Sequence, residues 1–279
     1  MSRMEPALIP LWYGPRIAVR TGTMTTSHRR RCLAGHSAIL AALVWILVAP
    51  GMARAEVAFG IYGGAAITAD CDVTLVQSGG TRLMFQGVSW ADESLSSPIY
   101  YGARLAYWFG GSSHWGVSAD FTHAKMLAEL DRKVAVSGTR AGAPVSRTET
   151  LGDTFDQLEL SHGFNLLTLN GTYRWLPGRD EGGNILGRIR PYASLGGGVA
   201  IPHFEVKTAG ATADANQVAG PVLQAGAGAD IGLTGRFSFF AEYRLSYADV
   251  TGDLSDGGTI SLQPWTNHFM LGVSTRFGD

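Results

Sequence analysis

Apolar and polar residues alternate along most of the chain from residue 57 onward. In the closing stretch NHFMLGVSTRFGD, Phe269, Leu271, Val273 and Phe277 share one parity, and small or polar residues fill most of the other. A period of two is typical of a β-strand whose faces meet different environments. The pattern recurs in eight segments, at residues 57–68, 98–109, 115–125, 164–176, 189–206, 220–233, 236–250 and 266–277. It predicts an all-β fold.

The connections between these segments differ in length at the two ends of the predicted meander. The connections at one end have short or intermediate lengths and lie at residues 110–114, 177–188 and 234–235. The connections at the other end are long and polar and lie at residues 69–97, 126–163, 207–219 and 251–265. Short turns at one end and long loops at the other, on an even number of strands, are typical of a transmembrane β-barrel. We predict one eight-stranded antiparallel up-and-down transmembrane β-barrel, with TRLMFQGVSW in the first long loop extending a strand as a hairpin.

The parity of the strands indicates which face of the barrel meets lipid. One face is almost wholly apolar, as at Leu167 and Leu169, and carries no charge. A soluble, lipocalin-like barrel would turn that face inward, and the pattern alone allows this. However, aromatic residues gather at the turn-side ends of the strands, as an interfacial girdle would. These are Phe109, Trp115, Tyr173, Trp175, Phe237 and Phe277. We therefore expect the apolar face to contact lipid.

The N-terminal segment has the layout of an export signal. Basic residues at 29–31 precede an apolar run at 38–48, and a small-x-small triplet ends at Ala55. These features are typical of a cleavable signal peptide. A membrane-spanning anchor is the alternative, but the apolar run is shorter than the roughly 20 residues that such an anchor needs. We predict that residues 1–55 are an N-terminal extension and signal peptide cleaved near Ala55. Residues 56–279 then form the barrel in the cell outer membrane.

Net charge and cysteine content each exclude one possibility, a nucleic-acid partner and an intramolecular disulfide. The formal net charge is -1 and 16% of residues are charged, so no nucleic-acid partner is indicated. Of the two cysteines, Cys32 lies in the segment expected to be removed, which leaves Cys71 alone. A mature chain with one cysteine forms no intramolecular disulfide.

The strand segments resemble a known family. SPIYYGARLAYWF, HGFNLLTLNGTYRW and WTNHFMLGVSTRFG are similar to the small eight-stranded outer-membrane barrels of the OmpA transmembrane domain and OmpX type, and most to their lipid A oxidase-like branch. The resemblance implies an enzyme that uses dioxygen to oxidise the proximal glucosamine of lipid A to 2-aminogluconate. Phe277 resembles the near-terminal aromatic residue that the barrel-assembly machinery reads during insertion, although Gly278 and Asp279 follow it.

Charged residues on the other parity predict the contents of the barrel. Side chains just fill the interior of an eight-stranded barrel, and buried charges persist when they are paired and hydrogen-bonded. We interpret them as a structural ion-pair network, with catalytic or gating carboxylates as the alternative. The residues are Arg104, Asp120, Arg174, Arg190, Asp230, Glu242, Arg244 and Arg276.

Three histidines lie at the loop-side ends of consecutive predicted strands: His123, His162 and His203. Imidazole is a common ligand of iron, copper and zinc, and an oxidase that uses dioxygen ordinarily needs a redox metal or an organic cofactor. We predict a redox metal at the outer rim, with Asp120 or Glu205 completing the shell. Parity turns His123 and His203 toward lipid unless a bulge re-aims them, and Pro202 favours such a bulge near His203. The alternative is a set of polar rim residues.

Three classes of function follow from these patterns. The first is a lipid A-modifying outer-membrane enzyme, in which the catalytic residues stay unassigned. The second is a non-enzymatic surface or envelope-stability barrel. The third, a small pore, is disfavoured by the charged interior. The expected partners are outer-membrane lipid, lipid A and, during insertion, the barrel-assembly machinery.

Overall fold

The computed structural model describes residues 55–110, 112–176 and 185–278. Residues 1–54 of the expected extension and signal peptide at 1–55 lie outside the described residues. Two short 3-10 helices, η1 (Leu151–Asp153) and η2 (Ile185–Arg188), accompany the strands. No helix in the described part of the chain is long and apolar enough to cross a membrane.

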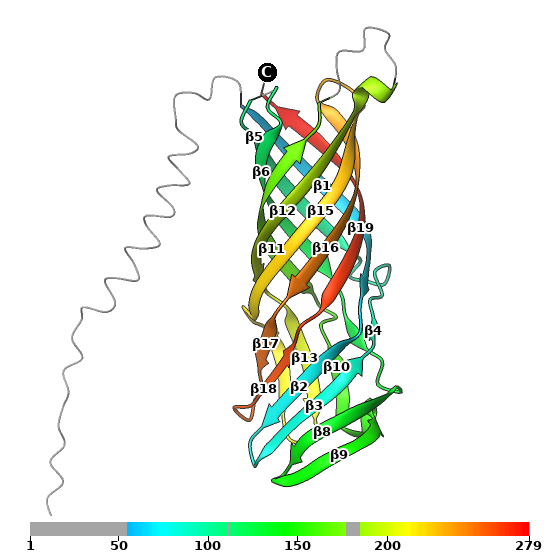
Figure 1. The fold of residues 1–279 in the computed structure, drawn as a ribbon, viewed down its shortest axis with the longest axis vertical. Coiled ribbons are helices and arrows are strands. Elements are labelled where there is room, and N and C mark those ends of the chain that lie inside the picture. Colours follow the sequence, from blue (N-terminus) through cyan, green and yellow to red (C-terminus); the bar gives the residue numbers. More distant parts are fainter. Residues whose placement is uncertain (1–54, 111, 177–184, 279) are drawn as a thin grey trace, which may run out of the picture. The chain divides into compact units, whose positions relative to one another are not determined.

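Eight antiparallel strands close into a barrel in the order β1, β19, β16, β15, β12, β11, β6 and β5 (Figure 1). Their bounds are β1 (Glu56–Thr68), β5 (Tyr101–Trp108), β6 (Trp115–Ala124), β11 (Phe164–Arg174), β12 (Ile189–Ala200), β15 (Gly220–Gly232), β16 (Phe237–Ala248) and β19 (Trp265–Phe277). The first and last strands pair from Val57 opposite Phe277 to Thr68 opposite Thr266. This pairing closes the barrel and confirms the predicted eight-stranded up-and-down fold.

The outer wall of the barrel carries a belt of exposed apolar side chains. Leu169 is 62% exposed and Leu195 71%, although both lie in the middle of long strands. At the turn-side end the ring of Tyr173 packs edge-on against those of Trp115 and Trp175, with centroids 4.8 and 4.9 Å apart. Soluble monomers rarely expose apolar patches of this extent, so the belt is the lipid-facing surface of a transmembrane barrel.

The long connections form two further sheets beyond the barrel end opposite Phe277 (Figure 1). We call them the head. One sheet contains, in spatial order, β14 (Thr212–Asn216), β13 (His203–Thr208), β10 (Phe155–Glu159), β7 (Leu127–Ala128) and β4 (Trp90–Ala91). The other contains β17 (Val250–Asp253), β18 (Thr259–Leu262), β2 (Cys71–Gln77), β3 (Thr81–Val88), β8 (Lys133–Arg140) and β9 (Ala143–Thr150). The expected hairpin is present as β2 and β3.

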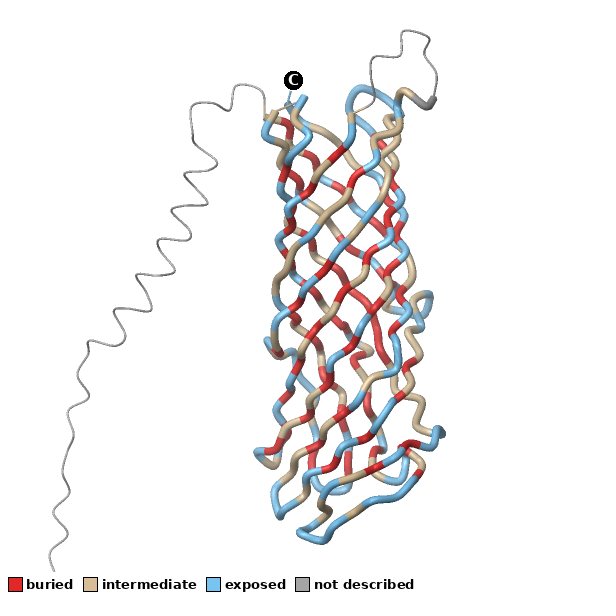
Figure 2. Tube along the Cα trace, in the orientation of Figure 1, coloured by how far each residue is buried: buried red, intermediate tan, exposed pale blue. Residues whose placement is uncertain are grey.

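The head has a buried apolar core, which Figure 2 shows as buried positions continuing past the barrel. Phe85 of one sheet and Phe155 of the other are both fully buried, and their ring centroids lie 5.1 Å apart. Phe204 and Leu151 belong to the same cluster. The connections are therefore a folded layer rather than the polar loops that their composition indicated.

We expect an arginine on the apolar belt to cost more than one on the exposed surface of the head. Leu169→Arg should lower the free energy of unfolding in a bilayer by roughly 2–4 kcal/mol, because the charge enters hydrocarbon. Met84→Arg, at a 41% exposed apolar position on β3, should change it by about 0.5 kcal/mol or less. Urea titration of both variants in lipid vesicles measures the difference. Equal effects would contradict the assignment of the belt to lipid.

We expect the head to loosen when its core is truncated. Phe155→Ala removes a fully buried ring that bridges the two sheets, a change that typically costs about 3–5 kcal/mol. Limited proteolysis should then cleave the head faster while the heat-modifiable gel mobility of the barrel is kept. Thr148→Ala, on the exposed edge strand β9, is the control. An unchanged cleavage rate in Phe155→Ala would argue against a packed core.

Candidate functional site

Four charged side chains cross the lumen of the barrel. The guanidinium of Arg104 contacts Asp120 at 2.7 Å and Glu242 at 2.7 Å. Arg244 contacts the same two carboxylates at 3.0 and 2.8 Å. Arg104 and Asp120 come from β5 and β6, whereas Glu242 and Arg244 come from β16, which lies opposite β6 in the barrel order. We call these four residues the lumen ring.

Neutral side chains satisfy the remaining acceptors of the lumen ring. The hydroxyl of Tyr192 donates to Glu242 at 2.6 Å. The hydroxyl of Ser118 and the amide of Asn170 donate to the second oxygen of Asp120, at 2.8 and 2.9 Å. Buried charges of this kind are tolerated when each is paired and hydrogen-bonded. The ring therefore forms a connected polar network that ties opposite walls together.

A second layer of charges lies nearer the turn-side end. Arg174 contacts both oxygens of Glu56, at 2.9 and 3.2 Å. Arg276 lies between the two acids of this layer, 3.4 Å from Glu56 and 2.6 Å from Asp230. Arg190 also contacts Asp230, at 3.0 Å. All eight charged residues expected inside the barrel thus point inward and form ion pairs, and Glu56 is a ninth that the sequence analysis did not name.

The two charged layers leave little open space between them. A cavity of about 70 Å³ is lined by Arg104 and Arg174 together with Trp108, Tyr192 and Phe240. Such a volume holds a few water molecules. Beyond it, Asp120 and Arg244 are each only 1% exposed. The described strands therefore enclose a filled interior rather than a channel.

His123 lies on the outer wall at the loop-side end of β6. Its Nδ1 donates to Oδ1 of Asn165 at 2.9 Å, and its ring stacks on that of Tyr101 with centroids 4.7 Å apart. The Nε2 atom is buried and has no hydrogen-bond partner among the described residues. His123 does not join the group formed by the other two rim histidines, and Asp120, considered as a further ligand, is part of the lumen ring.

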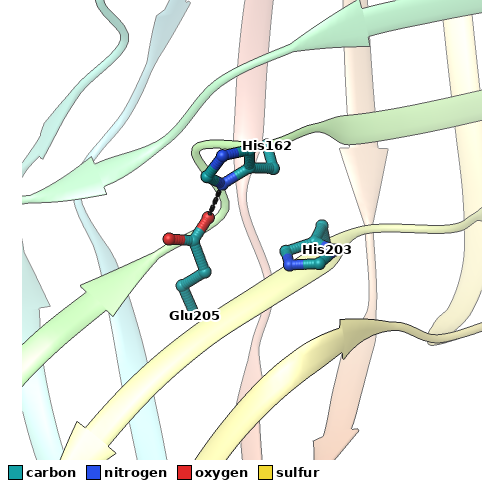
Figure 3. A group of neighbouring side chains, drawn as sticks. All are labelled: His162, His203 and Glu205. Carbon is teal, nitrogen blue, oxygen red and sulfur yellow. Dashed lines mark hydrogen bonds and ion pairs between the residues drawn. The ribbon is translucent and has the colours of Figure 1, made fainter.

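His162 and His203 meet Glu205 just beyond the barrel wall (Figure 3). One potential ligand atom from each lies within 4.8 Å of the others. We call these three residues the rim cluster. His162 hydrogen-bonds to the carboxylate of Glu205, and this bond together with the negative charge raises the pKa of His162. The ring of His203 lies 5.4 Å from that of His162 and donates through Nε2 to Asp214 at 2.9 Å.

A break in one predicted strand places His203 in this cluster. The segment expected as a single strand at 189–206 divides into β12, which ends at Ala200, and β13, which begins at His203. Pro202 lies in the break, where its missing N–H cannot join a ladder. Outward apolar residues end nearby at Leu167 and Val199, which are 47% and 37% exposed. The rim cluster therefore lies just past the apolar belt.

The closed barrel, its apolar belt and its filled interior define an eight-stranded transmembrane β-barrel protein with a folded head. No family model and no curated protein matches the chain. Similar solved structures include the outer membrane protein OprG from Pseudomonas aeruginosa, which is 14% identical over 81% of this chain and 97% of that chain, with a TM-score of 0.40.

Two further structures resemble the chain to a similar degree. Neisserial surface protein A is 11% identical over 80% of this chain and 97% of that chain, with a TM-score of 0.37. Ail of Yersinia pestis, in complex with the heparin analogue sucrose octasulfate, is 15% identical over 80% of this chain and 99% of that chain, with a TM-score of 0.33. The fold assignment rests on the strand pairing of the barrel itself.

We expect the lumen ring to respond as a unit to loss of one charge. Glu242→Gln leaves Arg104 and Arg244 to share Asp120, and breaking a buried pair in this way typically costs about 3–5 kcal/mol. Adding Arg244→Met to Glu242→Gln removes the uncompensated charge, so the double variant should lose less than the sum of the two single losses. Urea unfolding in detergent measures all three variants. Strictly additive losses would mean that the residues do not form one network.

Proposed function

We propose that this chain is an integral outer-membrane protein that acts at the outer surface of the membrane and does not conduct solutes. The observation that carries the proposal is the lumen ring, whose side chains from opposite walls fill the barrel interior. The apolar belt supports insertion into a bilayer. In this orientation the short turns, the start of β1 and the end of β19 face the periplasm, and the head faces outward.

We infer that the protein binds the headgroup of lipid A at the rim cluster. The rim cluster lies just past the last lipid-facing residues of β11 and β12, at the level expected for the sugar headgroups of the outer leaflet. The two histidines and Glu205 are polar side chains that a sugar or its phosphate can contact without crossing the membrane. Oxidation of the proximal glucosamine, with dioxygen as the oxidant, is the modification that the sequence resemblance implies.

A specific observation favours a second candidate, a non-enzymatic surface barrel. The head buries Phe85, Phe155 and Phe204 in its own core, which is more structure than a rim site for a lipid headgroup needs. A packed β-head presents a fixed surface and is suited to binding a partner outside the cell. In this alternative the rim cluster only stabilises the junction between head and barrel.

Mass spectrometry of lipid A separates the two candidates. We expect lipid A from aerobic cells that make the wild-type protein to contain species heavier by one oxygen atom on the disaccharide. These species should be absent from cells without the protein and from cells with Glu205→Gln at equal protein level. His123→Ala, which changes a rim histidine outside the cluster, should retain them. Identical lipid A in all four strains would reject the lipid A proposal and favour the surface barrel.

A further inference from the structure

The outward face of one head sheet carries three carboxylates in a row. Glu159 of β10 lies directly opposite Glu205 of β13, and Glu205 lies directly opposite Asp214 of β14. Directly opposite residues in an antiparallel sheet share a face, and like charges in such positions destabilise the sheet. No lysine or arginine among the described residues forms an ion pair with any of the three. Lys207 shares the outward face of β13 with Glu205 but forms no ion pair with the row.

Two histidines contact carboxylates of this row directly. His203 lies two residues before Glu205 on the same face of β13, and its imidazole contacts Asp214. His162 reaches Glu205 from the turn between β10 and β11. The ligand atoms of His162, His203 and Glu205 lie within 4.8 Å of one another. Atoms bound to one tetrahedral zinc ion at about 2.0–2.2 Å lie roughly 3.3–3.6 Å apart, so the side chains must move closer together to bind one ion.

Two neutral side chains also hold the central carboxylate, one of them at the oxygen that His162 contacts. The amide of Gln157 donates to one oxygen of Glu205 at 3.1 Å, and the hydroxyl of Ser161 donates to the other at 2.6 Å. Hydrogen bonds of this kind orient metal-ligating carboxylates. The side chain of His162 is 66% exposed and that of Asp214 84% exposed, whereas that of His203 is 20% exposed. An ion can therefore enter from solvent.

We propose that His162, His203 and Glu205, with Asp214 hydrogen-bonded to His203, bind one divalent first-row transition metal ion at the outer rim. Two imidazoles with carboxylates suit zinc and iron, whereas magnesium and calcium prefer sites made of oxygen alone. The ion would offset the row of acids and link β13, β14 and the turn before β11. This inference goes beyond the lipid A proposal and does not depend on it, because the site binds metal whether or not lipid A is altered.

Metal binding to the mature chain tests the proposal. The protein is purified in detergent without a histidine tag, treated with chelator and titrated with Zn²⁺ and with Co²⁺, whose absorption reports nitrogen and oxygen ligands. We expect one ion per chain. His203→Ala and Glu205→Gln should each weaken binding by more than the roughly 10–100-fold that loss of an outer-shell partner costs. Heat-modifiable gel mobility shows that each variant has kept its barrel.

The matched control is His123→Ala, which removes a rim histidine that lies outside the cluster. It should bind the ion as tightly as the wild type. A wild-type chain that binds no ion, or binding that is equal in the wild type, His203→Ala and Glu205→Gln, would overturn the proposal. So would equal weakening by His123→Ala and His203→Ala. Because this readout is binding, metal bound with unaltered lipid A rejects only the proposed function.

Discussion

The lumen ring is the interaction on which the rest of the structure depends. Arg104 and Arg244 each contact both Asp120 and Glu242, and the partners come from opposite walls of the barrel. Four buried charges are tolerated only when all are paired, so β5, β6 and β16 must keep their relative positions for the barrel to form. The same contacts fill the interior. In the proposed function, the protein therefore acts through the head and the rim cluster.

Local sequence was sufficient to predict the barrel but not the head. In β11, apolar and polar residues alternate regularly: Leu167 and Leu169 face lipid, and Thr168 and Asn170 face inward. Such regular alternation in each strand predicts the number of strands, their order and the direction in which their side chains face. The strands of the head are shorter and pair across long sequence separations, as β18 does with β2. A single buried ring such as Phe155, in a mostly polar segment, gives no periodic signal.

The sequence predicts the residues of the candidate sites wherever the alternation of inward and outward side chains continues unbroken along a strand. The eight interior charges followed from parity, whereas Glu56 was missed because it directly follows the expected cleavage site, although it shares the inward parity of Ala58. His162 and His203 do approach each other, with Glu205 beside them. His123 stays apart because β6 is regular to its end, while the break before β13 re-aims His203. Pro202 indicates the position of this break in the sequence, whereas the direction in which His203 then points depends on tertiary packing.

A filled lumen predicts that the barrel conducts no solutes, and planar-bilayer conductance tests this most directly. The purified mature protein is inserted into a bilayer, and its folded state is checked by heat-modifiable gel mobility. The account predicts no stable conductance steps above the protein-free baseline at any applied voltage, because the lumen ring and the second charged layer occupy the interior. Reproducible, stable steps from the folded wild-type barrel would contradict it.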